Sequence, residues 1–264
     1  MAGGAVAGFG LEAAGQRLYF ESDSAGIISI LKRRYGAFAC GARGAARFGV
    51  TAAAGKAYPF TPRVLAEGGR LEIRRGDFMA EAGRGGRGEL RAAPSEQCLD
   101  AFLRSLLSHG LLRRGGLMLH SAGLVKGGRA YLFPGKSGAG KSTLSKLAQA
   151  RGAEVISDEI NLLLPSGGGW RVFGSPFWGE MRSAGRQASW PLGGIRLLKK
   201  AGRDRLVPCG RGELLKALLR CTVNFDRSAA AGALALRNAA GLLAAARPAR
   251  LEFSRTGGDF LELI

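Results

Sequence analysis

The sequence has few residues that could form a metal cluster. It contains two histidines and four cysteines in 264 residues, and the cysteines lie far apart, at positions 40, 98, 209 and 221. No C-x-x-C pair occurs and no histidine stands at zinc-like spacing, which argues against a zinc knuckle. Four isolated thiols in a long chain fit a reducing compartment. The cysteine pattern therefore favours a cytoplasmic protein without a structural zinc site.

Long hydrophobic runs are also missing. Residues 1–5 lack the charged start and the continuous apolar core of a signal peptide. The most apolar long stretch, 228–246, is mostly alanine and contains Arg237 and Asn238. This stretch favours an amphipathic helix over a membrane span. We expect a cytoplasmic protein with no membrane partner.

Acidic residues are half as frequent as basic ones. The chain has 20 Asp and Glu against 39 Lys and Arg, which gives a net charge of +19. Such a charge is typical of nucleic-acid-binding proteins. The basic residues are nevertheless scattered, and the single arginine–glycine tract at 83–88 resembles both an RNA-binding tract and an ordinary surface loop. The pattern favours attraction to nucleotides, phosphoryl groups or an acidic protein over a dedicated nucleic-acid surface.

The chain is long and apolar enough for a globular α/β protein, with 46% hydrophobic residues. We predict two domains, a small β-rich N-terminal lobe at 1–93 and a larger domain at 94–264. Alternating and helical patterns predict a mixed β-sheet with flanking helices. The expected helices are 24–35, 95–110, 143–151, 212–223 and 228–246. The expected hairpins pair 71–74 with 78–80, 117–125 with 130–133, 195–198 with 205–207, and 251–254 with 260–263.

The clearest motif is Gly-Lys-Ser-Gly-Ala-Gly-Lys-Ser at 135–142, which has the G-x-x-x-x-G-K-[ST] spacing of a phosphate-binding loop (P-loop). An apolar strand precedes it and a helix follows, as this motif requires. Glycines let backbone N–H groups turn toward phosphates, and the helix N-terminus adds partial positive charge. Lys141 can reach the β- and γ-phosphates, and the Ser142 hydroxyl can bind Mg²⁺. The predicted nucleotide-binding residues are Gly135, Lys136, Ser137, Gly138, Ala139, Gly140, Lys141, Ser142 and Thr143.

Two acids and a histidine are expected at the same edge of the sheet as the loop. Asp158 and Glu159 follow the first strand after the loop helix, 17 and 18 residues beyond Lys141. Carboxylates there can hold Mg²⁺ or accept the proton of an attacking hydroxyl. The alternative is a surface acid pair. His120 lies on the strand that pairs with the one entering the loop, and it is either functional or a core residue.

These segments resemble a known family. His120-Ser121-Ala122-Gly123, the stretch 135–145 and Ile156-Ser157-Asp158-Glu159 are similar to the C-terminal domain of HPr serine kinase/phosphorylase. They are more distantly similar to the core of ATP-dependent phosphoenolpyruvate carboxykinase. Glu180-x-Arg182 falls where the HPr kinase signature begins. The chain departs from the family in having Glu159 as the second acid and Ser183-Ala184-Gly185 in place of a glycine-rich signature.

The resemblance implies a mixed sheet whose P-loop is entered from a hairpin, and an ATP- and Mg²⁺-dependent kinase. The acceptor would be a serine-like hydroxyl of a protein, peptide or small molecule. The resemblance is also compatible with assembly of the chain into a homo-oligomer. The implied Mg²⁺ ligands are Ser142, Asp158 and Glu180, with either acid of the pair as base. The implied catalytic residues are Asp158, Glu159, His120, Lys141 and Arg182. The alternative is a non-catalytic ATP-binding accessory protein that docks a partner; a transport ATPase is excluded by the absence of an L-S-G-G-Q-like signature.

Overall fold

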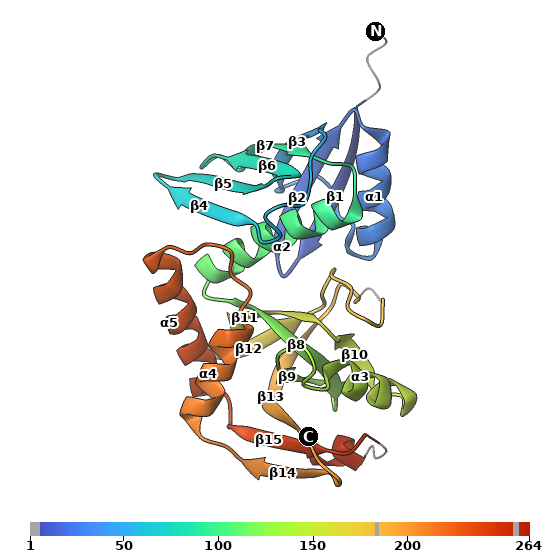
Figure 1. Ribbon diagram of the computed structural model, residues 1–264, viewed down its shortest axis with the longest axis vertical. Helices are drawn as coiled ribbons and strands as arrows, with labels where there is room; N and C mark the ends of the chain where they lie inside the picture. Colours follow the sequence, from blue (N-terminus) through green and yellow to red (C-terminus); the bar gives the residue numbers. More distant parts are fainter. Residues whose placement is uncertain (1–5, 183–184, 256–258) are drawn as a thin grey trace. The chain divides into compact units, whose positions relative to one another are not determined.

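The computed structural model describes residues 6–182, 185–255 and 259–264. Within these ranges the chain is a mixed α/β protein with five α-helices and two mixed β-sheets. It divides into two compact units (Figure 1). Unit 1 comprises the chain up to Gly110 together with Asn224–Ala231, and unit 2 comprises Leu111–Val223 and Gly232–Ile264. This division falls inside helix α2 (Glu96–Arg113), whereas the predicted domain boundary precedes that helix.

Unit 1 is built on a seven-stranded sheet with the order β1-β2-β3-β7-β6-β5-β4, drawn in blue to green in Figure 1. The strands β2, β3 and β7 run parallel to one another, and the other neighbours are antiparallel. Residues 83–86 of the arginine–glycine tract form the turn between β6 and β7, and residues 87 and 88 begin β7. The bounds are β1 (Ala7–Ala13), β2 (Gln16–Ser22), β3 (Ala46–Ala52), β4 (Arg63–Glu67), β5 (Arg70–Arg75), β6 (Phe78–Ala82) and β7 (Arg87–Ala92).

Aromatic side chains fill the core of unit 1. Phe20, Phe48 and Phe78 project from three strands onto Phe102 of α2, with ring centroids 5.8–6.4 Å from it. Helix α1 (Ala25–Tyr35) is capped by Ser24, whose hydroxyl accepts a hydrogen bond from the Ile27 N–H at 3.4 Å. The predicted helix and the β5–β6 hairpin are both confirmed.

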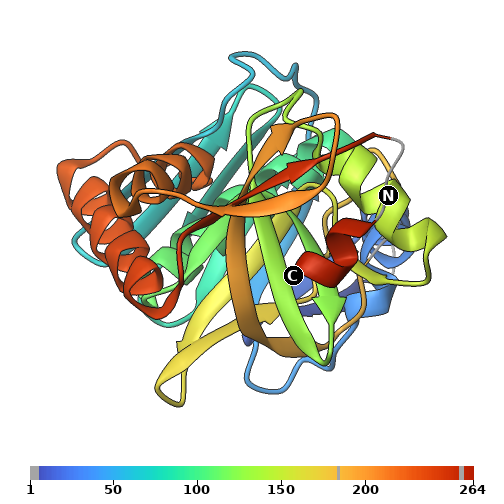
Figure 2. The same ribbon diagram turned by 90° about the horizontal axis from the view of Figure 1, so that it is seen from below.

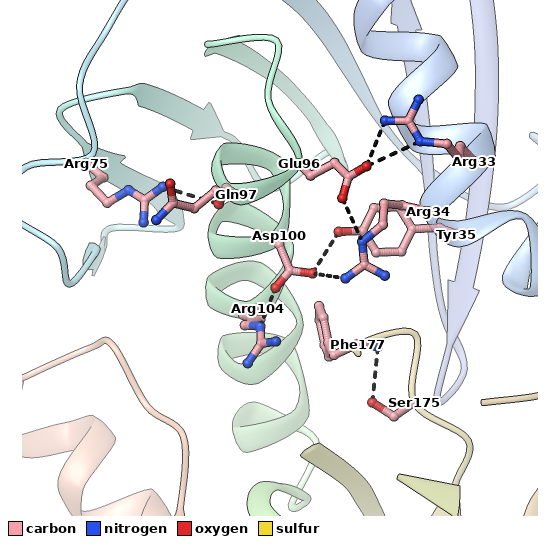
Figure 3. A network of polar contacts seen from close by, with 10 residues as sticks. All are labelled: Arg33, Arg34, Tyr35, Arg75, Glu96, Gln97, Asp100, Arg104, Ser175 and Phe177. Carbon is pink, nitrogen blue, oxygen red and sulfur yellow. Dashed lines mark hydrogen bonds and ion pairs between the residues drawn. The ribbon is translucent and has the colours of Figure 1, made fainter. Parts of the chain in front are cut away.

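A network of ion pairs joins α1 to α2 within unit 1 (Figure 3). The Asp100 carboxylate accepts hydrogen bonds from Tyr35 Oη at 3.0 Å, Arg34 Nη2 at 3.2 Å and Arg104 Nε at 2.6 Å. Burial and the charge of Asp100 raise the pKa of Tyr35. Asp100 therefore keeps its charge compensated by arginines from both helices.

Unit 2 contains the second sheet, of eight strands, and most of helix α5. The main strand order of this sheet is β10-β8-β11-β12-β13-β15-β14, and β9 pairs with both β8 and β13. Helices α4 and α5 lie side by side in both views (Figures 1 and 2). The bounds are β8 (Leu117–Lys126), β9 (Arg129–Pro134), α3 (Lys141–Ala150), β10 (Glu154–Ser157), β11 (Ile160–Ser166), β12 (Gly169–Phe173), β13 (Ser189–Lys200), β14 (Arg205–Pro208), α4 (Arg211–Cys221), α5 (Ala229–Ala245) and β15 (Ala249–Phe253).

The long strand β13 connects the parts of this sheet (Figure 2). Its start pairs with β12, its middle runs parallel to β9 and its end runs parallel to β15. Because β9 also pairs with β8, and β8 with β11, the pairings close a ring of five strands. The predicted β8–β9 hairpin is confirmed, so the segment that leads into residues 135–140 is held on both edges.

Three predictions for individual elements are wrong. The strands near 195–198 and 205–207 do not pair, because β15 lies between β13 and β14. Asp259–Leu263 forms a 3₁₀-helix, so the last hairpin does not exist; its expected turn lies outside the described residues. Helix α2 continues past Gly110 to Arg113. A Cβ at Gly110 would collide with the side chain of Gln16, so this glycine permits close packing and does not end the helix.

The helix predicted at 228–246 is confirmed as α5, which runs from Ala229 to Ala245. No helix in the described part of the chain is both long and apolar enough to cross a membrane. All four cysteines are free thiols.

Candidate functional site

The site is built around the loop between β9 and α3. Gly138 and Gly140 adopt φ values of +79° and +103°, which disfavour any side chain. A Cβ at Gly140 would also lie 2.7 Å from the Phe253 ring. Helix α3 begins at Lys141 with no side-chain cap on its first turn. Its first N–H groups are therefore left to bind something other than a cap, and an anion suits them best.

Lys141 is buried and bends back over the loop. Its Nζ donates hydrogen bonds to the carbonyl oxygens of Gly135 at 2.8 Å and Lys136 at 3.1 Å. Burial lowers the pKa of Lys141, and the nearby Cys221, Glu159, Glu180 and Asp158 oppose this effect. The three carboxylates therefore lie close enough to Lys141 for their charge to act on it, Glu159 more strongly than the other two.

Asp158 lies just after β10 and is buried, with 6% of its surface exposed. Its Oδ2 accepts a hydrogen bond from the Met181 N–H at 3.3 Å. A Cβ at Gly179 would collide with the same carboxylate, so only glycine permits this approach. The Ser157 hydroxyl accepts the Glu159 and Ile160 N–H groups at 3.1 Å each and shapes the turn. The segment 179–181 thus holds Asp158 in one position.

Glu159, Glu180 and Arg182 differ in their surroundings. Glu159 is half-buried, and its carbonyl accepts the Ser121 N–H at 2.9 Å. Glu180 and Arg182 are exposed, on the irregular segment that follows β12. Arg182 has a φ of +48°, and its N–H donates to the Gly179 carbonyl at 3.1 Å. This turn presents both side chains to solvent near Asp158.

His120 lies beside the loop as predicted. It stands opposite Ile160 in the β8–β11 register, and its carbonyl accepts the Gly135 N–H at 3.4 Å. Its side chain is half-buried. The other predicted nucleotide-binding residues lie in the loop or just after it. Ser137 is exposed and Ala139 is half-buried in the loop, and Ser142 and Thr143 are half-buried in the first turn of α3.

Three residues near the loop were missed from the sequence. Gly179 and Met181 lie in an irregular segment with no periodic pattern, so nothing in the sequence indicated that they hold Asp158. Cys221 ends α4, some 80 residues from the loop. Burial raises the pKa of Cys221, while the charge of Lys141 and the Gly135 backbone oppose this. These long-range contacts have no local signal.

The donor set around the loop consists of hydroxyl and carboxylate oxygens. Among the described residues no group of three or more His, Cys, Asp or Glu side chains is arranged to hold a metal ion. The predicted Mg²⁺ set combines the Ser142 hydroxyl with carboxylates of Asp158 and Glu180, and hydroxyl and carboxylate oxygens suit that ion. Glu180 is exposed and Asp158 is held by Met181.

A family model described as SynChlorMet cassette protein ScmC matches residues 102–236, which are 135 of the 264 residues. The chain belongs to the ScmC family. The match includes the loop, Lys141, Asp158, Glu159, Glu180 and Arg182. No curated protein matches the chain.

The assignment to the ScmC family corrects the resemblance to HPr serine kinase, which is wrong as a family assignment. That resemblance rested on three short segments, and a glycine–lysine loop followed by acids on the next strand is too short a pattern to distinguish families. The same segments lie inside the ScmC match. The prediction of an α/β protein with mixed β-sheet is confirmed, since the described part of the chain forms two mixed sheets and five helices. An HPr-kinase core is not shown.

Proposed function

We propose that the chain is an ATP-dependent kinase that transfers the γ-phosphoryl group to a serine-like hydroxyl of a protein, peptide or small molecule. One observation carries the proposal: among the described residues, the hydrogen-bond partners of the buried lysine at the start of α3 are only carbonyl oxygens, while three carboxylates lie near enough to affect its pKa. A buried cation without a bonded anion is costly for a purely structural residue. A phosphate would supply the missing charge.

In this proposal residues 135–142 are a phosphate-binding loop. The glycine backbone and the uncapped first turn of α3 bind the phosphates, and Lys141 leaves the carbonyls of Gly135 and Lys136 to bind them too. Mg²⁺, when bound, would neutralise charge on the transferred phosphoryl group. Ser142 and Glu180 would hold it, and Asp158 would be the third ligand or the base.

The two adjacent acids receive different roles on structural grounds. Asp158 is buried and fixed by Met181 and Gly179, which suits a group that orients an acceptor hydroxyl and takes its proton. Glu159 is half-buried and acts more strongly on Lys141, which suits a role at the phosphates and metal. His120 would help to position the loop through its carbonyl, and Arg182 would stabilise the transferred group.

Replacing the proposed base tests the function. Asp158→Asn keeps the size of the side chain, and we expect it to lower phosphoryl transfer about 10²- to 10⁴-fold, the usual contribution of a general base. The measurement is transfer of label from γ-labelled ATP to candidate hydroxyl acceptors with Mg²⁺. The exposed Asp23→Asn is the matched control and should transfer at the parent rate. Equal rates in both variants would remove Asp158 from the mechanism.

A second candidate is an ATP-binding accessory protein that docks a partner and catalyses nothing. It is favoured by one observation: the Asp158 carboxylate is buried and lies close against Gly179, and its Oδ2 already accepts the Met181 N–H, which leaves less room for an acceptor hydroxyl. Tight ATP binding without transfer or hydrolysis, lost in Lys141→Ala, would support this candidate over the kinase.

A further inference from the structure

A cavity of about 260 Å³ opens on the side of the loop where α4 ends. Its walls come from the first two loop residues, from Leu197 of β13 and from one face of α4. On that face the residues recur three and four positions apart, as one side of a helix requires. The lining residues are Gly135, Lys136, Leu197, Glu213, Lys216, Ala217, Arg220 and Cys221.

The charge of this cavity is positive. Lys136, Lys216 and Arg220 contribute three cations, and among the described residues none of the three has an ion-pair partner. The one acid of the lining, Glu213, is paired with Arg250, which also donates a hydrogen bond to it. Arg220 can complement the C-terminal end of the α4 dipole, but Lys216 is more than a turn away from that end.

The apolar part of the lining adds no compensating negative charge. Leu197 and Ala217 are uncharged, and burial raises the pKa of the Cys221 thiol, so this thiol is neutral at ordinary pH. Three like charges around one cavity repel one another and favour an anionic occupant. The positive cavity shares Gly135 and Lys136 with the loop itself.

The size of the cavity limits what can fill it. Sites that enclose a whole small molecule usually have volumes of about 300–1,000 Å³. At about 260 Å³ this cavity suits a charged end group and not an entire nucleotide. An end group bound here lies next to the loop, which would bring the rest of its molecule to the phosphates.

We infer that the cavity between the loop and α4 binds an anionic group, carboxylate or phosphate, of the phosphoryl acceptor. The acceptor is then an acidic hydroxyl compound or an acidic peptide. This inference rests on the proposed kinase function, but anion binding in the cavity can be measured separately from it. Lys216 and Arg220 are the specificity residues, because they line the cavity and belong to no part of the loop.

Binding of small anions to the nucleotide-loaded protein tests the inference. The full chain is saturated with Mg²⁺ and a non-hydrolysable ATP analogue, and inorganic phosphate and succinate are titrated in separate arms by equilibrium dialysis. We expect one anion per chain, bound at least about tenfold more weakly by Lys216→Gln/Arg220→Gln, since removing one charged hydrogen bond weakens binding about tenfold. The arm that binds more tightly identifies phosphate or carboxylate as the recognised group.

The matched control is Lys146→Gln/Arg151→Gln, which removes two exposed cations, one in the middle of α3 and one just after its end, both outside the cavity. This variant should bind the anion like the parent, and all variants should bind the ATP analogue equally. The inference is overturned if the control and the α4 variant weaken anion binding alike, if the analogue displaces the anion, or if no anion binds. If the parent fails to bind the analogue, the proposed function fails, and dialysis without analogue still decides whether the cavity binds anions.

Discussion

Two buried cations, one in each unit, are held in opposite ways. In unit 1 Arg75 is 7% exposed and makes two hydrogen bonds to the Asp77 carboxylate, Nε to Oδ1 at 2.6 Å and Nη2 to Oδ2 at 2.7 Å. It also donates to the Gln97 carbonyl at 3.3 Å (Figure 3). In unit 2 Lys141 is also 7% exposed, and within the described part of the chain it donates only to two carbonyls.

The difference separates a structural charge from one suited to a ligand. A bidentate Arg–carboxylate pair compensates both charges and fixes their geometry. Carbonyl oxygens satisfy the lysine's hydrogens but supply no bonded anion, and the nearby carboxylates compensate its positive charge only from a distance. We therefore expect removal of Arg75 to damage folding and removal of Lys141 to damage binding.

The largest expected effect is on stability in unit 1. Arg75→Met leaves Asp77 buried without its partner, and we expect the free energy of unfolding to fall by about 3–5 kcal/mol. Urea unfolding measures this change. The matched control is Arg33→Met, which breaks an exposed ion pair to Glu96 and should lower stability by no more than about 1 kcal/mol. Equal losses in the two variants would show that the buried pair is no more important than the exposed one.

The next effect is on nucleotide binding in unit 2. We expect Lys141→Met to weaken ATP binding about 10²-fold, because charge-assisted hydrogen bonds to the phosphates are removed. The same variant should unfold in urea without nucleotide at an equal or higher free energy than the parent, since a poorly compensated buried charge is removed. Calorimetry measures the dissociation constant for ATP, and urea titration measures the free energy of unfolding. The control is Lys146→Met, on the exposed face of α3. A loss of stability as large as that of Arg75→Met would make Lys141 a structural residue.

Local patterns predicted the elements that carry the loop, because their signals are local. The β8–β9 hairpin and the helix that follows the loop both depend on residues within a few positions of one another, although α3 begins at Lys141, two residues before the predicted start. Gly110 shows the limit of such signals. It has the form of a helix stop, yet contact with Gln16, distant in sequence, decides its role.

The parts of the fold and site that were not predicted depend on contacts distant in sequence. Strand β15 inserts between β13 and β14, which are close in sequence and have the pattern of a hairpin. Met181 and Gly179 hold Asp158 from an irregular segment, and Cys221 reaches the loop from the end of α4. The family was mistaken for a different reason, which is the shortness of the motifs that were compared. Three short motifs describe a phosphate loop and its acids, whereas the ScmC match depends on the longer stretch 102–236.

The smallest expected effect is the pH dependence of the two buried groups. Burial alone would raise the pKa of Asp77, but the hydrogen bonds and charge of Arg75 outweigh it and lower that pKa below 3.8. Burial lowers the pKa of Lys141 below 10.5. In both cases the unfolded chain binds the proton more tightly, so stability rises with pH between the folded and unfolded pKa values.

These two ranges lie at opposite ends of the pH scale. The stabilisation from Asp77 is complete above its unfolded pKa and is lost as the pH falls through its folded pKa. The penalty from charged Lys141 is complete below its folded pKa and disappears as the pH rises toward its unfolded pKa. We therefore expect the stability difference between Lys141→Met and the parent, measured in urea without nucleotide, to shrink from pH 7 toward about pH 10. Lys146→Met should show no such trend; if Lys141→Met shows none either, the Lys141 charge is already compensated in the folded protein and a phosphate is not needed to compensate it.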